Sequence, residues 1–423
     1  MNLLTSPIAK ALLPIICISF TSCIKKETGS SLPKGTYGYD VAFLKKYKSG
    51  IIELQDETGK AKVLLAAGYQ GRVMTSTSAG DTGLSYGWLN YGLIQSGEKK
   101  KQFNPVGGEE RLWLGPEGGQ YSIYFEQGDS FKIEHWQVPP ILDTIAYDLV
   151  QVTPSLATFT KKAHLKNYSG QVFDFTIERT IVLLTHAQVA EKLKTNLSDK
   201  LTLVGYETRN TLINTGSSDW TKEKGLLSIW LLGMFTPSPQ TMVIIPFQPI
   251  PNAGSLITKN YFGEIPANRL SITDSLLYFT CDGSYRSKIG ISPRIAKPLA
   301  SSFDFENNVL TVVVPWISKD APYVNSKWEM QNDPYRGDVI NSYNDGPLED
   351  GSQLGPFYEI ESSSPALALK KGESSSYVQT TIHLQGNYGL MKELVLQLLG
   401  VNLDVVKQNL KKLPIHSPST QTL

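Results

Sequence analysis

The feature that most constrains the fold is a series of short apolar runs separated by turn signals. Residues 172–181 (VFDFTIERTI) alternate with a period of two, which is the spacing of a β-strand with one buried face. Residues 226–235 (LLSIWLLGMF) are almost wholly apolar and predict a strand that is buried on both faces, and residues 308–316 (NVLTVVVPW) predict a central strand. The chain is therefore predicted to be mainly β, with a large antiparallel β-sandwich and minor helices.

Two stretches depart from this pattern and predict helices. Thr185 and Gln188 have the spacing of a capping box, so a short helix should run to about Leu193. Near the C-terminus, leucines recur at helical spacing between residues 390 and 399, and a second short helix should run to residue 410. Both C-terminal helices should pack on the domain.

The first residues of the chain have the features of an export signal. Lys10 precedes an apolar run, residues 11–20, that is short for a membrane-spanning helix and is followed by small residues before Cys23. The arrangement resembles a bacterial lipobox, in which Cys23 becomes the lipidated first residue; a plain signal peptide with an incidental cysteine is the alternative. A lipid on Cys23 would anchor the protein to the outer membrane of the cell envelope, facing the periplasm or the surface.

These features divide the chain into a lipoprotein signal peptide (1–22), a tether (23–35), a β-sandwich (36–388), C-terminal helices (389–412) and a disordered tail (413–423). With 41% hydrophobic residues, 19% charged residues and a net charge of +1, the composition is that of a globular protein. It gives no electrostatic basis for nucleic-acid binding. Cys281 is the only cysteine after Cys23, so it is interpreted as a buried thiol outside any disulfide or cysteine-based zinc site.

Two carboxylates on one predicted strand are the first candidates for a functional site. Side chains alternate along a strand, so Phe357, Glu359 and Glu361 should share one face. Such a face suits the wall of a polar pocket better than an open surface. Repulsion from Glu361 should raise the pKa of Glu359, which would then suit the role of a general base.

A glycine-rich block, residues 107–119, contains the second group of candidates. It lacks the Gly-Lys-Ser/Thr ending of a phosphate-binding loop, so a nucleotide site is rejected. It instead predicts a strand over 111–114 in which Arg111 and Trp113 point to one side. Guanidinium donors and a flat ring match the hydroxyl pairs and apolar face of a sugar; a structural cation–π pair is the alternative. Glu117, in the same block, is a further candidate contact.

Residues 131–136 (FKIEHW) also alternate and predict a strand that carries His135 and Trp136. His135 would be a natural proton carrier near neutral pH, with a structural role beside Trp136 as the alternative. Trp136 and Trp316 would add aromatic surface to a sugar site.

The remaining charged candidates are weaker. Lys288 and Arg294 are interpreted as solvated surface charges beside a strand end. Carboxylates of one loop could hold calcium, but solvated loop charges are the favoured interpretation for all of them: Asp345, Glu349 and Asp350. No metal site and no cofactor are predicted.

Several blocks of the chain resemble known families. The order of features from Glu359 to Leu384 resembles the C-terminal end of the aldose 1-epimerase (galactose mutarotase-like) superfamily. Residues 37–410 resemble, more closely, an uncharacterised family of bacterial lipoproteins with a mutarotase-like fold, through the blocks GGEERLWLGPEGGQYSIYF, LLSIWLLGMF, KIGISPRIAKP and VINSYNDGP. The resemblance implies a large antiparallel sandwich of the mutarotase type, with its ligand groove on one sheet.

The resemblance also implies roles for two residues and contains one departure. Glu359 corresponds to the general base that takes the proton of the anomeric hydroxyl, and Arg111 corresponds to a sugar-contacting arginine. The stretch that supplies a catalytic histidine in mutarotases has none here: its occupants are Ser228, Trp230 and Met234.

Two functional hypotheses follow. The favoured one is a lipid-anchored envelope protein with a non-catalytic carbohydrate-binding groove that contains Arg111, the tryptophans and the carboxylates. The alternative is a carbohydrate epimerase, or another carbohydrate-active enzyme, in which Glu359 is the base and His135 the acid.

Overall fold

The computed structural model describes residues 32–410. The predicted signal peptide, Cys23, most of the tether and the predicted tail lie outside these residues. Within residues 32–410, no helix combines the length and apolar character that crossing a membrane would require.

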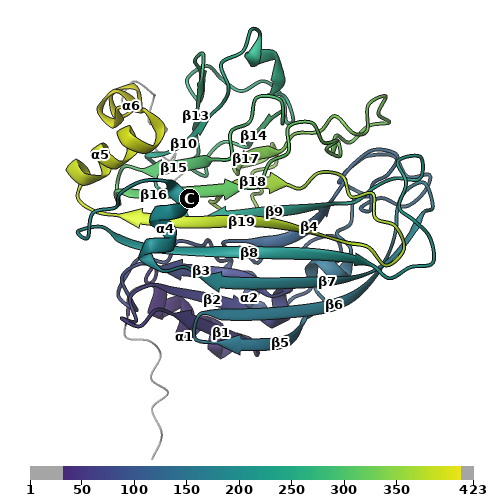
Figure 1. Ribbon diagram of the computed structural model, residues 1–423, viewed down its shortest axis with the longest axis horizontal. Helices are drawn as coiled ribbons and strands as arrows, with labels where there is room; N and C mark the ends of the chain where they lie inside the picture. Colours follow the sequence, from purple (N-terminus) through teal and green to yellow (C-terminus); the bar gives the residue numbers. More distant parts are fainter. Residues whose placement is uncertain (1–31, 411–423) are drawn as a thin grey trace, which may run out of the picture.

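Two large antiparallel sheets form the body of the protein (Figure 1). The ten-stranded sheet has the order β12 (Leu270–Ile272), β13 (Leu276–Thr280), β10 (Thr241–Pro246), β15 (Ala300–Asp304), β16 (Val309–Pro315), β19 (Ser374–Gln385), β8 (Thr202–Asn214), β7 (Val172–Leu183), β6 (Leu156–Lys166) and β5 (Asp148–Thr153). The six-stranded sheet has the order β11 (Ile257–Thr258), β14 (Ser287–Ile291), β17 (Ile340–Asn344), β18 (Tyr358–Ser363), β9 (Ser228–Phe235) and β4 (Arg111–Gly115). The prediction of a mainly β fold with large antiparallel sheets is confirmed.

The two sheets pack face to face through apolar side chains. Leu112 of β4 and Ile229 and Leu231 of β9 pack in one core with Phe175 of β7 and Tyr206 of β8. A second core joins β14, β17 and β18 to β10 and β13 of the ten-stranded sheet. Because strand side chains alternate, this packing turns the other face of each sheet outward.

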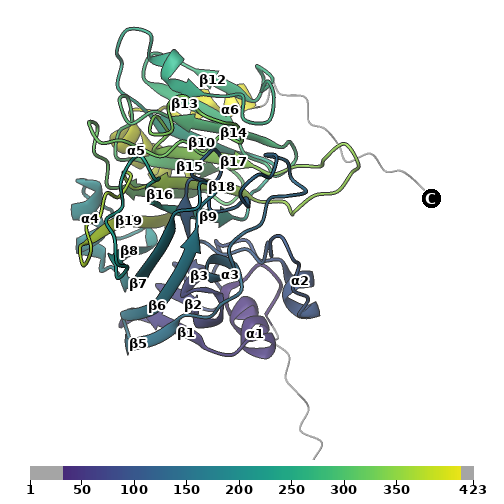
Figure 2. The ribbon, with the colours of Figure 1, turned by 90° about the vertical axis from the view of Figure 1, so that its right-hand side faces the viewer.

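A smaller unit at the N-terminal end completes the fold. It contains the three-stranded sheet β1 (Ile51–Gln55), β2 (Lys62–Ala66) and β3 (Arg72–Thr77), with helices α1 (Tyr37–Tyr47) and α2 (Tyr91–Ser96) beside it (Figure 2). The predicted β-sandwich over residues 36–388 thus begins with a helix, α1, instead of a strand. The helix buries Tyr37 and Leu44 against Leu64 and Met74 of the small sheet, so a tertiary contact stabilises it.

The helices predicted at residue 185 and near the C-terminus are present. Thr185 and Gln188 form the expected capping box of α4 (His186–Leu193). The helices α4, α5 (Tyr388–Leu399) and α6 (Leu403–Leu410) pack in one core with β10, β15, β16 and β19, on the face of the ten-stranded sheet that points away from the six-stranded sheet. The remaining helical segments are α3 (Pro140–Asp143) and the single turns η1 (Ala67–Tyr69) and η2 (Ala253–Leu256).

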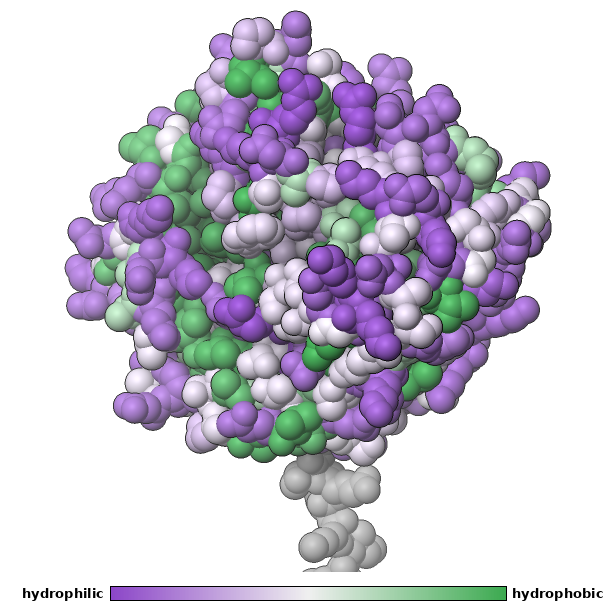
Figure 3. Space-filling view, turned by 45° about the vertical axis from the view of Figure 1, so that its right-hand side comes forward, coloured by the Kyte–Doolittle hydropathy of each residue, from purple (hydrophilic) through white to green (hydrophobic). Residues whose placement is uncertain are grey.

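Polar and apolar residues are mixed on the surface. On the face shown in Figure 3, hydrophilic residues predominate at the rim and hydrophobic residues form smaller areas between them. Cys281 is a free and fully buried thiol, as expected.

Candidate functional site

The outward face of the six-stranded sheet brings the predicted carboxylates and Arg111 together. Leu232 of β9 lies opposite Arg111 on one side and Glu361 on the other. Tyr343 of β17 lies opposite both Glu359 and Lys288. Directly opposite residues of antiparallel strands point to the same face, so all four charged side chains share it.

The glycines of the 107–119 block shape the approach to β4. Gly107 and Gly108 have φ angles of 92° and 115°, in the region that other residues rarely adopt. A Cβ atom on Gly107 would lie 2.0 Å from the carbonyl oxygen of Trp88. The block is therefore glycine-rich because its backbone passes close to a neighbouring segment before Arg111.

Arg111 and Glu359 form a buried pair. Arg111 Nη2 donates to Glu359 Oε1 at 2.9 Å, and both side chains are about 6% exposed. The guanidinium lies 4.2 Å from the centre of the Trp113 ring and 5.2 Å from that of Phe103. The predicted common orientation of Arg111 and Trp113 is confirmed, and Arg111 is also the counter-charge of Glu359.

Glu361 has a second set of partners. Its Oε2 accepts a hydrogen bond from Lys288 Nζ at 2.9 Å and another from Trp230 Nε1 at 3.0 Å. Lys288 Nζ also lies 5.1 Å from the centre of the Trp230 ring. The interpretation of Lys288 as a solvated surface charge is wrong, because its side chain is only 13% exposed and pairs with a fully buried carboxylate.

Glu117 and Trp136 complete the surroundings. Trp328 donates a hydrogen bond to Glu117, whose carboxylate also interacts electrostatically with Lys288 and Arg111. Trp136 packs on Trp113, with ring centres 6.3 Å apart, and stacks on Trp328 at 6.0 Å. We call Arg111, Glu117, Lys288, Glu359 and Glu361 the charged cluster; tryptophans border it on the Trp113 side.

Burial governs the proton balance of the charged cluster. It raises the pKa of Glu359 from its usual 4.5 to about 8; Arg111 opposes this shift and Glu361 adds to it. Burial likewise raises the pKa of Glu117. For Lys288, burial lowers the pKa, but the carboxylates of Glu361 and Glu117 outweigh it and the pKa is raised overall.

The charge count accounts for the raised pKa of Glu359. The cluster contains three carboxyl groups and two cations, so one carboxyl is left without its own counter-charge. Glu361 receives the ammonium of Lys288 and the indole N–H of Trp230. Glu359 receives a single donor nitrogen from Arg111 and is repelled by Glu361, so burial raises its pKa to about 8 and favours its protonated form near neutral pH.

Several buried donors beside the cluster have no acceptor among the described residues. They are Arg111 Nε, Arg111 Nη1, Trp113 Nε1 and Trp136 Nε1. Leaving a buried donor without an acceptor costs about 1–3 kcal/mol. Hydroxyl groups of a ligand would supply such acceptors, and the rings of Trp113 and Trp230 would supply apolar surface.

Two predicted residues are not brought to the charged cluster, contrary to expectation. Residues 131–136 form turns instead of a strand, and the exposed His135 pairs with Asp129 at 3.4 Å. Trp316 follows β16 of the ten-stranded sheet and is 55% exposed. None of the histidines that the structure describes hydrogen-bonds to a member of the cluster.

The loop carboxylates also differ from expectation in one respect. Asp345 is buried, accepting hydrogen bonds from the Tyr343 hydroxyl at 2.6 Å and the Gly355 N–H at 3.0 Å, whereas Glu349 and Asp350 are exposed. Within residues 32–410, no group of three or more histidine, cysteine, aspartate or glutamate side chains is arranged to hold a metal.

Sequence reasoning missed a second buried polar network, which lies between the two large sheets. Glu110 pairs with Arg179 at 2.9 Å, and Glu109 accepts from or shares a proton with His383 at 2.8 Å. Glu110 and Arg111 are adjacent on the chain and point to opposite faces, so the two networks lie on opposite sides of β4.

Sequence reasoning also missed Lys288 as a member of the charged cluster. Alternation along residues 288–291 puts Lys288 and Gly290 on one face of the strand, and this was the signal that could have indicated it.

Comparison with solved structures finds similar proteins at low identity. A putative aldose 1-epimerase from Escherichia coli has a TM-score of 0.48 and 11% identity, over 79% of this chain and 98% of that one. A galactose mutarotase-like protein from Lactobacillus casei has a TM-score of 0.44 and 14% identity, over 79% and 100%. A galactose mutarotase related enzyme from Lactobacillus acidophilus has a TM-score of 0.43 and 11% identity, over 80% and 98%.

The search of curated proteins found no match. Residues 35–410 match a family described as a Family of unknown function (DUF6786), and the match covers both large sheets, the small sheet and helices α1 to α6 of the described residues. The match extends over most of the chain, and the protein belongs to this family.

Proposed function

We propose that the protein is a lipid-anchored, carbohydrate-binding protein of the cell envelope, held at the outer membrane through Cys23, and that the charged cluster is its sugar site. The lipobox-like sequence before Cys23 supports the anchor. The grouping of a guanidinium, carboxyls and tryptophans on one sheet face supports the sugar site.

The observation that carries the sugar site is the incomplete pairing of Arg111. One of its nitrogens binds Glu359, while Nε and Nη1 are buried without an acceptor among the described residues. Vicinal hydroxyls of a sugar fit two donors held in a planar fork. Trp113, whose ring lies 4.2 Å beneath the guanidinium, forms an apolar wall beside these donors.

Binding to a glycan array, followed by calorimetry with the best ligand, tests this proposal. The Arg111→Ala substitution should weaken binding roughly ten- to a hundred-fold, because hydrogen bonds to a charged group contribute about 1.5–3 kcal/mol. Arg294→Gln, which changes an exposed arginine, is the matched control and should bind normally. If Arg111→Ala folds normally by circular dichroism and binds as tightly as the wild type, the site is wrong.

The alternative is a carbohydrate epimerase in which Glu359 is the general base. The raised pKa of Glu359 favours it, because a carboxyl that titrates near pH 8 can exchange protons under physiological conditions. Glu359 would take the proton of the anomeric hydroxyl and Lys288, which is protonated, would donate one to the ring oxygen. His135 cannot take that role from its position on the exposed loop beside Asp129.

Polarimetry and NMR on a panel of aldoses distinguish the two functions. Turnover should rise as the pH passes about 8, where Glu359 ionises, and should be lost in Glu359→Gln. Glu349→Gln, on the exposed loop, is the control that should keep full turnover. Sugar binding without any turnover selects the binding protein, whereas turnover that survives Glu359→Gln removes Glu359 from the mechanism.

A further inference from the structure

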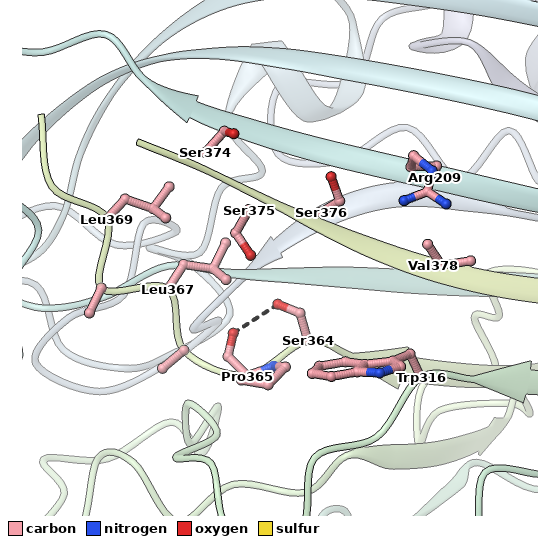
Figure 4. Close-up of a pocket in the computed structure, with 12 residues that line it drawn as sticks. Arg209, Trp316, Ser364, Pro365, Leu367, Leu369, Ser374, Ser375, Ser376 and Val378 are labelled. Carbon is pink, nitrogen blue, oxygen red and sulfur yellow. Dashed lines mark hydrogen bonds between the residues drawn. The ribbon is translucent and has the colours of Figure 1, made fainter. Parts of the chain in front are cut away.

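A second candidate ligand site lies on the outward face of the ten-stranded sheet. A pocket of about 620 Å³ opens where β19 begins, between that strand and the segment 364–369 (Figure 4). Its volume falls within the roughly 300–1,000 Å³ of small-molecule sites. The lining includes Arg209, Trp316, Pro365, Leu367, Ser376 and Val378.

Strand register places the key residues of this pocket in one row. Val378 of β19 lies opposite Arg209 of β8, and the backbone N–H of Trp316 donates to the carbonyl of Val378 at 3.2 Å. The three residues therefore cross neighbouring strands, which are spaced about 4.8 Å apart. The Cα atoms of Trp316 and Arg209 are thus roughly 10 Å apart, with Val378 between them, which leaves space for one sugar ring.

The row faces away from the six-stranded sheet. Arg209 is exposed, whereas Thr208 and Asn210 on either side of it point into the space between the sheets and are fully buried. Figure 4 shows the Trp316 ring beside Pro365 and the Arg209 guanidinium pointing toward Val378. The charged cluster is on the other sheet, so the two sites share no residue.

The exposure of Trp316 is unusual within this protein. All seven tryptophans lie in residues 32–410; five are at most 8% exposed, Trp328 is half-buried in a ring stack, and Trp316 is 55% exposed. An open indole face at a pocket wall is a platform on which the C–H face of a sugar can lie. Arg209 makes no hydrogen bond or ion pair with any described residue, so its charge is available to a ligand.

We propose that this pocket, which we call the Trp316 pocket, binds an acidic saccharide. The sugar ring would stack on Trp316 and its carboxylate would pair with Arg209, whose planar fork suits a carboxylate. The exposed hydroxyls of Ser374 and Ser376 lie beside this path and can bind ring hydroxyls. The inference does not depend on the proposed function, because it uses none of the charged cluster.

Fluorescence titration tests the proposal, because Trp316 is the exposed tryptophan. The probes are a trigalacturonate, its methyl ester and inorganic phosphate. Trigalacturonate should change the emission of the wild type, and Trp316→Ala should abolish both the change and the binding measured by calorimetry. Arg209→Gln should weaken trigalacturonate binding roughly ten-fold and leave the weaker binding of the methyl ester unchanged, since only the acid pairs with the guanidinium.

Two control variants separate this site from the charged cluster. Arg294→Gln removes another exposed arginine and should bind trigalacturonate like the wild type. Loss of trigalacturonate binding in Glu359→Gln but not in Trp316→Ala would place the ligand at the charged cluster and overturn the Trp316 pocket while supporting the first site. Absence of trigalacturonate binding in the wild type, or binding of phosphate that matches it, would also overturn the proposal.

Discussion

Glu359 is expected to hold a proton at neutral pH, and this has a consequence for stability. Its pKa is about 8 in the folded protein and near its usual 4.5 in the unfolded chain. The folded state therefore binds the proton more tightly. The stabilisation is complete below about pH 4.5 and is lost as the pH rises through about 8.

Urea unfolding of the wild type and of Glu359→Gln, at pH about 5 and about 9, measures this effect. Glutamine mimics the protonated carboxyl and does not titrate. The wild type should lose stability relative to the variant between the two pH values. An unchanged difference would show that Glu359 is not the carboxyl that holds the proton.

At the scale of elements, helix α4 offers a direct test of the capping box. The Thr185 hydroxyl accepts from the Gln188 N–H, and the Gln188 side chain accepts from the Thr185 N–H. At α1 the N-cap residue is Thr36, whose side chain makes no capping hydrogen bond to the helix. The same type of residue therefore occurs at two helix starts with and without the capping contact.

Thr185→Ala should lower the free energy of unfolding by about 1 kcal/mol, and Thr36→Ala by at most a few tenths. Urea denaturation of both variants measures the difference. Equal losses would mean that the capping contact of Thr185 contributes nothing beyond the residue change itself.

At the scale of elements, the sequence predicted some of the side-chain placements in the site and not others. Alternation along a strand was enough to place Glu359 with Glu361 and Arg111 with Trp113. The same pattern failed at residues 131–136, where turns replace the strand that would have carried His135. Alternation alone was not enough to assign Lys288 to the site, because its burial depends on β17, which separates it from the strand of Glu361 and is contributed by a later part of the chain.

For the whole molecule, the lipid anchor remains a prediction about residues outside the described range. The wild type should incorporate labelled palmitate in a bacterial host and partition into detergent, and Cys23→Ala should abolish both. Cys17→Ala removes a cysteine of the predicted signal peptide and should still be labelled. Labelling that persists in Cys23→Ala, or a wild type that is never labelled, would contradict the anchor.

The pairing of Arg111 with Glu359 joins residues that are 248 positions apart in the chain. Closing so long a segment carries an entropic cost that must be met before the pair can form, which delays such contacts during folding. In the folded sheet, strand β9 lies between the two strands that carry the pair. A chain whose synthesis ends before residue 358 would contain Arg111 but would lack its partner, Glu359. Sugar binding at this site would thus report that synthesis and folding had both reached the C-terminal part of the protein.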